Sequence, residues 1–539
     1  MAQIAPNPHP ASASSSLWRT TWLKYFLLLV LFMGAFFRFY HIDHKVYWYD
    51  ETMTSLRISG YTQPQAQELV YGIEHHTIEE FRAQYQYPKN GSTSAEMWVA
   101  LAQHPEHSPA YYALARSWMQ LFPNGVLSIR LLSVLISLLA FPCMYWLVWE
   151  LFQSPLVSWA AVSILAISPF HVLYAQEARE YSLWTTAILF ASAALLWAMR
   201  RNRPLHWLGY GVANALALYV HPFSGFVTIS HGLYVAIAER CRFNRRTISC
   251  LMALLLSMAL FAPWLQVVVQ QSDLFVGNTA SVSQPRSGVL PLFWLLNLSR
   301  LFFDLNQGPS AINPVHYWLA GLAIASIIYL CRQTTPKRWG FVLLLMGVTG
   351  LAIIGPDVLL GGRRSSITRY AVPSYLGLQI SVAFLFANRI TVNPFAAPGT
   401  FRWPPFWRNT AIALVFAGFL SCAVNAHNPV WWHKSYSKSR RNPDVAAMIN
   451  QSDRPLVISD KKPLGYILSL THLLDGDVGL QLIDQPEQTR IPKRFETVFL
   501  YLPSENLKQR LENRKNITLE PITFGRSDDP WLWQVLRTE

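Results

Sequence analysis

Long apolar segments recur along this chain, and they constrain its fold more than any other feature. Most are about 17–25 residues long, which is the length a helix needs to cross the hydrocarbon core of a bilayer. A backbone surrounded by lipid must satisfy its own polar groups, so such segments have to be helical. The sequence, 52% hydrophobic and 14% charged, therefore predicts a mainly α, polytopic transmembrane helical bundle with about 11 spans. The expected spans are 22–40, 128–150, 156–173, 181–199, 206–221, 223–239, 247–268, 315–331, 339–355, 370–387 and 409–425.

Basic residues between the expected spans predict the orientation of the chain. They follow the fourth, sixth, eighth and tenth spans, so all of these loops fall on one side, and basic loops are typical of the cytoplasm. An odd number of spans then places residues 41–127, 269–314, 356–369 and the C-terminal region outside. The basic residues concerned are Arg200, Arg201, Arg203, Arg240, Arg242, Arg245, Arg246, Arg332, Lys337, Arg338, Arg389, Arg402 and Arg408, together with Arg19 before the first span and Lys24 near its start.

The net charge of +14 has two readings. In a soluble protein it would indicate nucleic-acid binding. Here the basic cytoplasmic loops of a membrane protein account for most of it, so we expect membrane lipids as partners and no nucleic acid. The five cysteines form no CxxC pair, and no disulfide framework is expected.

Composition divides the chain into three regions. Residues 1–16 are small and Pro-rich, and residues 1–21 are predicted to be a disordered cytoplasmic N-terminus. Residues 22–428 are predicted to form the transmembrane domain, with interfacial helices in the long outer loop 41–127. In residues 429–539, we expect three short buried strands, PLVISD, VGLQLID and TVFLYLP, alternating with three helices, PDVAAMIN, PLGYILSLTHLL and SENLKQRLENR. This alternation predicts a small extracytoplasmic α/β domain with an accessory role.

Asp50 and Glu51 lie side by side in VYWYDETMTS, directly after the first apolar segment. One reading is structural: Asp50 would cap a helix, and both carboxylates would favour the positive end of that helix. The other reading is chemical. The three aromatic residues 47–49 place the pair at the membrane interface, where a partly desolvated carboxylate could act as a general base.

The stretch HPEHSPAYYALARSWMQLF starts at His104. Ser108 is a suitable N-cap for a helix, and Tyr111 opens an apolar stripe that predicts an amphipathic helix on the membrane surface. His104 and His107 are three residues apart and could bind a metal or a phosphate. Two histidines without a clear third ligand are more often ordinary polar residues. The involvement of a divalent metal therefore stays open.

Two further polar stretches follow expected spans on the same side. In YAQEAREYSL, Glu177 and Glu180 would share one helical face, and Arg179 could pair with either. Such a cluster is either an interfacial salt-bridge group or a second acidic group near a site. In YVHPFSGF, His221 is a candidate contact to phosphate or substrate, although a single His before Pro is usually structural.

The loop GGRRSSITRY, residues 361–370, breaks the charge rule because Arg363, Arg364 and Arg369 are predicted to lie outside. Basic residues on this side suggest an anionic partner such as a phosphate. The alternative is that these long side chains reach lipid headgroups.

In this order, these stretches resemble the GT-C superfamily of glycosyltransferases. More narrowly, the chain is similar to bacterial family 39 proteins, which are relatives of protein O-mannosyltransferases and of the aminoarabinose transferase that modifies lipid A. The resemblance covers about residues 20–390. Its carriers are YDE at 49–51, HSPAYYALARSWMQLF at 107–122, SIRLLSVLISLLAFPCMYWLVWELF at 128–152, SPFHVLYAQEAREYSL at 168–183 and ITRYAVPSYL at 367–376.

The resemblance implies roles for particular residues. The first acidic residue of the family's DE pair is its base, which corresponds to Asp50. The family's HPPLYY-like stretch appears here as HSPAYY, with Ser108 in place of the first proline, and His107 and Tyr111 are candidate substrate contacts. The RYxxP element corresponds to Arg369 and Tyr370, and an arginine at this position is expected to contact the donor phosphate.

The implied activity is sugar transfer from a polyprenyl-phosphate donor to a hydroxyl of a lipid, glycan or protein. The enzyme would be an inverting hexosyl- or pentosyltransferase of the bacterial plasma (inner) membrane, with its site outside. No cofactor is required by any motif. The alternative is a transporter or flippase of lipid-linked sugars, which should carry charged residues within its spans. The expected spans are nearly free of them.

Overall fold

The computed structural model describes residues 21–71, 76–88, 92–284, 289–390, 404–434, 438–460, 464–524 and 530–537. Residues 1–20, for which disorder was predicted, lie outside this part of the chain, and so does their basic residue Arg19. Arg402 also lies outside it. The chain divides into two compact units. The helical unit comprises Met1–Tyr40, Glu106–Ala110 and Ser133–Ala426, and the loop–tail unit comprises His41–Pro105, Tyr111–Leu132 and His427–Glu539.

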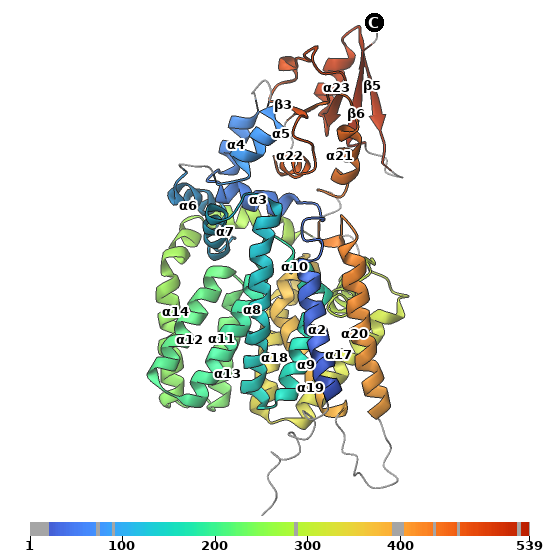
Figure 1. Cartoon of the computed structure of the whole chain (residues 1–539). Coiled ribbons are helices and arrows are strands. Elements are labelled where there is room, and N and C mark those ends of the chain that lie inside the picture. Colours follow the sequence, from blue (N-terminus) through green and yellow to red (C-terminus); the bar gives the residue numbers. More distant parts are fainter. Residues whose placement is uncertain are drawn as a thin grey trace, which may run out of the picture. The chain divides into compact units, whose positions relative to one another are not determined.

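The helical unit is a bundle of apolar helices that run alongside one another (Figure 1). Every expected span coincides with a helix or a bent helix pair, which confirms a mainly helical, polytopic fold. Within the described residues, seven helices are long and apolar enough to cross a membrane, or eight with the bent pair α9–α10. The number eleven therefore stays a prediction. The helices are α2 (Thr21–Phe39), α8 (Val126–Phe152, which begins in the loop–tail unit), α9 (Pro155–Ala166), α10 (Pro169–Ala175), α11 (Tyr181–Arg201), α12 (Pro204–Val220), α13 (Ser224–Ala238), α14 (Arg245–Gln270), α15 (Ser272–Thr279), α16 (Leu290–Ser299), α17 (Pro314–Gln333), α18 (Pro336–Leu360), α19 (Val372–Ile390) and α20 (Pro404–Ala426).

The third expected span is broken by a bend of 60° between α9 and α10. Pro169 cannot donate a backbone hydrogen bond, so the helix loses the partner of the Leu165 carbonyl. Arg38 of α2 compensates for this loss: its guanidinium donates to the carbonyl oxygens of Leu165 (3.3 Å) and Ala166 (2.6 Å). This buried arginine has a structural use within the bundle, because an unsatisfied backbone carbonyl in a membrane costs several kcal/mol.

Residues 361–371 are held against α16, a short apolar helix that the sequence did not suggest as a separate element. The Asn297 side chain of α16 donates to the Ser366 carbonyl (3.0 Å) and accepts from the Thr368 hydroxyl (2.7 Å). Trp294, also in α16, donates to the Ser365 hydroxyl (3.0 Å). Most of this arginine-rich loop therefore has a defined backbone course, with 3₁₀ turns at Arg364–Ser366 and Thr368–Ala371.

The loop–tail unit is built on a six-stranded mixed sheet with the order β1-β3-β2-β4-β6-β5. β2 pairs in parallel with β3 and β4, and the remaining pairs are antiparallel. The elements are α3 (Tyr49–Ile58), α4 (Gln63–Val70), β1 (His76–Thr77), α5 (Ile78–Tyr85), α6 (Ser94–Ala102), α7 (Ala110–Leu121), α21 (Asn442–Asn450), β2 (Leu456–Asp460), α22 (Leu464–Thr471), β3 (Gly479–Ile483), β4 (Val498–Tyr501), α23 (Glu505–Glu512), β5 (Ile517–Ile522) and β6 (Leu532–Arg537).

The three strands and three helices expected in the tail are present, whereas β5, β6 and β1 were not foreseen. β1 belongs to the first long loop, yet it pairs with β3 of the tail. One apolar core joins the two segments: Leu56, Phe81 and Tyr85 of the loop pack with Ile467 and Phe499 of the tail. The sequence assigned the loop to the membrane domain and made residues 429–539 a domain of their own. That division stays a prediction, and in the structure both segments build the same core.

Candidate active site

Helix α3 carries both of the predicted acidic residues in its first turn. It begins at Tyr49, and Trp48 occupies the N-cap position with extended backbone angles. Asp50 is therefore inside the helix and does not cap it, contrary to the structural reading of the sequence. Carboxylates in the first turn are stabilised by the free N–H groups and the positive end of the helix. The start of a helix alone thus accounts for two acidic residues at this place. It does not show that either of them has a chemical role.

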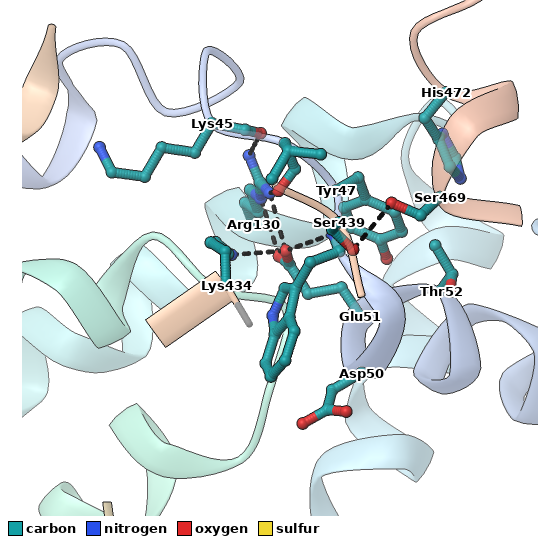
Figure 2. A network of polar contacts seen from close by, with 12 residues as sticks. Lys45, Tyr47, Asp50, Glu51, Thr52, Arg130, Lys434, Ser439, Ser469 and His472 are labelled. Atoms are coloured by element: carbon teal, nitrogen blue, oxygen red, sulfur yellow. Dashed lines mark hydrogen bonds and ion pairs between the residues drawn. The ribbon is translucent and has the colours of Figure 1, made fainter. Parts of the chain in front are cut away.

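Glu51 lies at the centre of a fully buried charge network (Figure 2). The Arg130 guanidinium donates to both of its carboxylate oxygens, each at 2.8 Å. The Lys434 ammonium donates to Oε2 at 2.7 Å, and the Trp48 backbone N–H approaches the same oxygen at 3.4 Å. Charge-assisted bonds of this kind are about twice as strong as neutral ones. The Glu51 carboxylate is accordingly fixed in one position.

Arg130 also holds the chain that leads into α3. Its NH1 group donates to the carbonyl oxygens of Ile42 (3.0 Å) and Lys45 (2.9 Å), and its NH2 group donates to that of Val46 (3.0 Å). Because these carbonyls have no place in a helix or sheet, the arginine satisfies groups that would otherwise be costly to bury. One side chain near the start of α8 thus organises both the entry to α3 and its first turn.

Asp50 differs from its neighbour. Its side chain is partly exposed, and Figure 2 shows its carboxylate turned away from the Arg130 and Lys434 side chains. Its backbone carbonyl accepts the Thr54 hydroxyl at 3.0 Å. The two adjacent carboxylates of the sequence therefore occupy distinct environments. Only the Asp50 carboxylate has the accessibility that a proton acceptor for an external substrate needs.

Burial affects the titration of groups that surround this turn. Desolvation, together with the nearby Glu51 charge, raises the pKa of Tyr47, whose hydroxyl is 2.6 Å from that of Ser55. Burial, reinforced by the charges of Arg82 and Arg130, lowers the pKa of His472 to about 3. His472 is therefore neutral at physiological pH.

The Gln86 side chain connects this histidine to α3. The His472 Nε2 atom lies 3.0 Å from Gln86 Oε1, and the Gln86 amide group donates to the Thr52 carbonyl at 3.3 Å. Because that amide nitrogen is the donor, Oε1 accepts, and the His472 proton is on Nε2. The side chain of Tyr111, predicted to contact substrate, is fully buried in this same unit.

In the helical unit, residues 176–180 form a turn between α10 and α11. Glu177 and Glu180 consequently do not share a helical face, because the helix is interrupted between them. Arg179 forms an ion pair with Glu180 at 3.1 Å, and its backbone N–H donates to the Glu177 carbonyl at 2.7 Å. All three side chains are buried. A buried turn with three ionisable groups is a candidate for function as well as for structure.

His107 joins this turn. Its Nδ1 atom lies 4.0 Å from a Glu180 carboxylate oxygen, and its Nε2 atom lies 3.8 Å from Glu106. Ser108 is not the N-cap that the sequence suggested, since its hydroxyl donates to the Leu218 carbonyl (3.1 Å) and α7 begins two residues later. Across the ranges that the structure describes, no group of three His, Cys, Asp or Glu residues is arranged to hold a metal ion.

Tyr181 is the residue around which the predicted basic residues gather. The guanidinium carbons of Arg179 and Arg369 lie 5.8 Å and 5.7 Å from the centre of its ring. His221 lies 6.3 Å from the same ring, and the charges of Arg179 and Arg369 both act on it. Arg369 also lies 5.8 Å from the ring of Tyr370. Residues from three distant parts of the sequence therefore meet at one aromatic ring.

His221 has a defined orientation within this group. Its ring stacks on that of Trp184 at 3.9 Å, and its Nδ1 atom accepts the Phe223 backbone N–H at 3.1 Å. Any proton on the neutral ring is therefore on Nε2. The Phe223 ring in turn contacts that of Tyr370 at 5.1 Å, so His221 and Tyr370 belong to one aromatic cluster.

The arginines at 363 and 364 differ in their surroundings. Arg364 pairs with the buried Asp357 of α18 at 3.1 Å, and the Ser365 backbone N–H and hydroxyl donate to the other Asp357 oxygen at 2.6 and 2.7 Å. Arg363 is held through its backbone N–H, which donates to the Val282 carbonyl at 3.0 Å. The Arg364 guanidinium is thus paired with the Asp357 carboxylate, which also holds the backbone of the loop. The Arg363 guanidinium takes no part in that pair.

The helical unit also contains a partly open apolar cavity of about 340 Å³ between α2, α9, α19 and α20. Leu27, Ile164, Phe386 and Leu414 are among its lining residues, and Arg408 is its only charged lining residue among those described. An apolar cavity of this size within membrane-type helices can take up hydrocarbon chains.

Sequence reasoning missed Arg130, Lys434, Tyr181 and Asp357. A signal existed for Arg130, since an arginine at the start of an apolar helix requires a partner. Lys434 carries no such signal: it follows the last expected span in a basic, aromatic stretch and meets Glu51 across 383 residues of chain.

Comparison with known proteins assigns the fold. Residues 104–266 match the model of the family described as dolichyl-phosphate-mannose-protein mannosyltransferase. The structure is similar to that of the oligosaccharyltransferase from Archaeoglobus fulgidus (TM-score 0.51, 12% identity, covering 96% of this chain and 75% of the other). It is also similar to that of ArnT from Cupriavidus metallidurans bound to undecaprenyl phosphate (TM-score 0.50, 14% identity, covering 96% and 98%). This chain has the GT-C fold. No curated protein matches its sequence.

The GT-C resemblance inferred from the ordered motifs is therefore confirmed, as are its links to mannosyltransferases and ArnT. The family match starts at His104 and ends within α14. It thus includes the whole Glu177–Glu180 turn and His221. It does not include Asp50, Glu51 or the arginines of residues 361–371, so the match says nothing of their roles.

Proposed function

We propose that this GT-C chain is a membrane glycosyltransferase that moves a hexose or pentose from a polyprenyl-phosphate donor to a hydroxyl group of a lipid, glycan or protein. One observation carries the proposal. The segment that matches the mannosyltransferase family is the segment whose turns bring His107, Arg179, Glu180 and His221 into one cluster. The likeness to ArnT, whose structure contains undecaprenyl phosphate, supports a lipid-phosphate donor.

Asp50 is the proposed general base. Its carboxylate accepts the proton of the acceptor hydroxyl while that oxygen forms a bond to the anomeric carbon of the sugar. The bond between this carbon and the phosphate oxygen breaks, and its electron pair leaves with the lipid phosphate. Attack opposite to the leaving group inverts the anomeric carbon. Glu51, predicted from sequence to be catalytic, is proposed to position this turn because its carboxylate is held by two buried cations.

Cationic residues of the helical unit are proposed to stabilise the leaving phosphate. Arg369 is partly exposed, and with Arg179 it borders the Tyr181 ring. Fixed positive charge is most effective where the transition state develops negative charge. His107, Tyr370 and His221 would border the sugar or phosphate, with Arg363 and Arg364 as further phosphate contacts. The apolar cavity between α2 and α20 offers space for a hydrocarbon chain.

The proposed location is the bacterial plasma membrane, with the site and the C-terminal region outside. The basic loops of the sequence support this orientation. Single cysteines in residues 300–313 and 240–244, labelled by a membrane-impermeant maleimide in intact cells, test it. Labelling of the first loop and protection of the second are expected, and the reverse pattern would contradict the orientation.

The decisive experiment replaces the proposed base. Asp50→Asn should lower kcat by about 10²–10⁴-fold, the usual contribution of a positioned general base, while expression and thermal unfolding stay unchanged. Asp43→Asn is the matched control, since Asp43 is an exposed carboxylate seven residues earlier. Sugar transfer is measured with purified protein in detergent and a polyprenyl-phosphate sugar. Full activity of Asp50→Asn would remove Asp50 from the mechanism. A wild-type protein that forms no product under any donor, but moves lipid-linked sugars across vesicles, would instead indicate a transporter.

Arg369→Ala tests the phosphate role. The expected result is a higher KM for the donor and a lower kcat, with an unchanged KM for the acceptor. Arg389→Ala is a control in the same helical unit, because Arg389 packs on the Tyr329 ring at 4.6 Å. An unchanged dependence of rate on donor concentration would exclude Arg369 as a donor contact.

A further inference from the structure

The two residues that flank Asp50 are both held by the C-terminal segment. Tyr49 precedes Asp50, and its backbone N–H donates to the Ser439 hydroxyl at 3.3 Å. Glu51 follows Asp50, and its carboxylate accepts the Lys434 ammonium at 2.7 Å. Both contacts lie within the loop–tail unit. The backbone of Asp50 is therefore fixed on each side by residues that come almost 400 positions later in the chain.

Side-chain packing reinforces these contacts. The Tyr49 ring has the Lys438 ammonium above it at 3.9 Å and the Tyr466 ring at its edge at 5.8 Å. Gly465 of α22 approaches the same ring so closely that an added Cβ atom would lie 2.5 Å from its carbons. The Tyr49 N–H is one of the unpaired donors of a helix N-terminus, so Ser439 supplies a cap from a distant part of the chain.

Charge balance singles out Lys434. Arg130 alone neutralises Glu51 and contacts both of its oxygens. Lys434 adds a second positive charge to a site where all three side chains are fully buried. Burying an ammonium group costs free energy that the remaining attraction only partly returns. What the Lys434–Glu51 contact adds is an attachment of the tail to the first turn of α3.

We propose that Lys434 is a positioning residue: by holding Glu51, it makes the C-terminal segment fix the orientation of Asp50. The C-terminal segment, for which the sequence predicted an accessory role, thereby helps to align the base Asp50. This inference rests on the proposed function, because it assumes that Asp50 acts on substrate. Its effect should appear in kcat, since a misplaced base impairs the reaction step and leaves donor binding intact.

The test compares Lys434→Met with Lys508→Met. Lys508 is another lysine of the tail, paired with Glu505 and packed on Trp533 far along the sequence. Lys434→Met leaves the neutral Glu51–Arg130 pair, so folding should be retained. We expect kcat to fall at least tenfold for Lys434→Met, with the donor KM within twofold of wild type and an unchanged unfolding temperature. Lys508→Met should leave kcat unchanged. Equal kcat values for the two variants would overturn the proposal.

Ser439→Ala provides a milder second variant should Lys434→Met fail to fold. It removes the hydroxyl that accepts from the Tyr49 N–H and from the Ser469 hydroxyl, each at 3.3 Å. A smaller decrease of kcat without a change of KM is expected. A kcat equal to that of wild type would then overturn the proposal. A double-mutant cycle with Glu51→Gln adds a second criterion. If Lys434 acts through Glu51, Lys434→Met should have little further effect on kcat in the Glu51→Gln background. Additive effects would exclude that route.

Hydrogen exchange separates this inference from the proposed function, because it does not depend on catalysis. In Lys434→Met, amides of residues 49–54 should exchange faster than in wild type, while those of β2 and β4 keep their protection. Unchanged exchange at residues 49–54 would overturn the positioning role even if Asp50→Asn is inactive. Faster exchange together with a fully active Asp50→Asn would leave the anchoring in place and refute Asp50 as the base.

Discussion

The buried carboxylates of Glu51 and Asp357, one in each unit, each hold a segment of chain that carries predicted site residues. In the loop–tail unit, Glu51 accepts bonds from Arg130 and Lys434, and all three side chains are excluded from water. In the helical unit, Asp357 accepts bonds from Ser365 and from Arg364, whose side chain is 27% exposed. Both carboxylates fix a segment of chain, but only the second has a cationic partner with access to solvent.

This difference in the solvent access of the cationic partners indicates how strongly the first turn of α3 and residues 361–371 are each constrained. Removing the charge of Glu51 would take away the anion that Arg130 and Lys434 share, and both of these side chains are fully buried. Removing the charge of Asp357 would leave an arginine that can turn to solvent. We therefore expect the first turn of α3 to tolerate substitution poorly and residues 361–371 to tolerate it better. The following predictions test this contrast, beginning with the largest expected effect.

Glu51→Gln should destabilise the loop–tail unit by about 3–5 kcal/mol, the usual cost of breaking a buried ion pair by removing one partner. The measurement is thermal unfolding in detergent, combined with hydrogen exchange of β2, β3 and β4. Glu505→Gln is the matched control, because the Glu505 carboxylate is 76% exposed. A Glu51→Gln protein as stable as the control would show that the network contributes little to folding.

Acidification should weaken the loop–tail unit through His472. The unfolded chain takes up a proton near pH 6.5, whereas the folded protein resists protonation down to about pH 3. Stability is therefore complete above pH 6.5 and is lost as the pH falls through this window, by about 1.4 kcal/mol per pH unit. The slope of unfolding temperature against pH measures the effect. His472→Gln should flatten it, and replacement of the exposed His427 should not. An unaltered slope in His472→Gln would assign the acid sensitivity to other groups.

Asp357→Asn should cost about 1–3 kcal/mol, since one amide oxygen can still accept a bond but the Ser365 N–H or hydroxyl loses a charged partner. Faster hydrogen exchange confined to residues 361–371 is the expected observation. Ser310→Ala, in an exposed loop of the same unit, serves as control. If exchange also rose throughout α18 and α19, Asp357 would support the bundle and not only the loop.

Arg364→Gln should have the smallest effect on stability, less than about 1 kcal/mol, because a partly exposed ion pair is screened by water. The unfolding temperature of the helical unit measures it. A loss as large as that of Glu51→Gln would remove the distinction between the two carboxylate centres.

The sequence predicted several parts of the molecule well for identifiable reasons. Segments such as 181–199 and 370–387 are apolar over lengths that only helices can bury in lipid, so their structure is local. The tail strand 456–460 and the helix 505–512 follow from runs of buried residues between turn signals. β1 was not predictable, because two residues, His76 and Thr77, become a strand only through pairing with β3.

The candidate site also contains some features that the sequence predicted and others that it did not. The ordered motifs YDE, HSPAYY, QEAREY and ITRY led to the GT-C resemblance, which the comparisons confirm. The helical face expected for Glu177 and Glu180 was wrong, because a turn interrupts the helix there. Local spacing describes neighbours along a regular helix, but it does not reveal where that helix stops when tertiary contacts compete.

By itself, the sequence determined a helical membrane bundle, a small α/β tail and the chemical types gathered in the loops, since hydropathy and chain periodicity act over short distances. Tertiary structure alone decided that Glu51 is enclosed by Arg130 and Lys434 while Asp50 is left partly exposed. Adjacent carboxylates look equivalent in a sequence. Their environments differ because neighbouring side chains on a helix point in different directions, so Arg130 and Lys434 reach the Glu51 carboxylate inside the core.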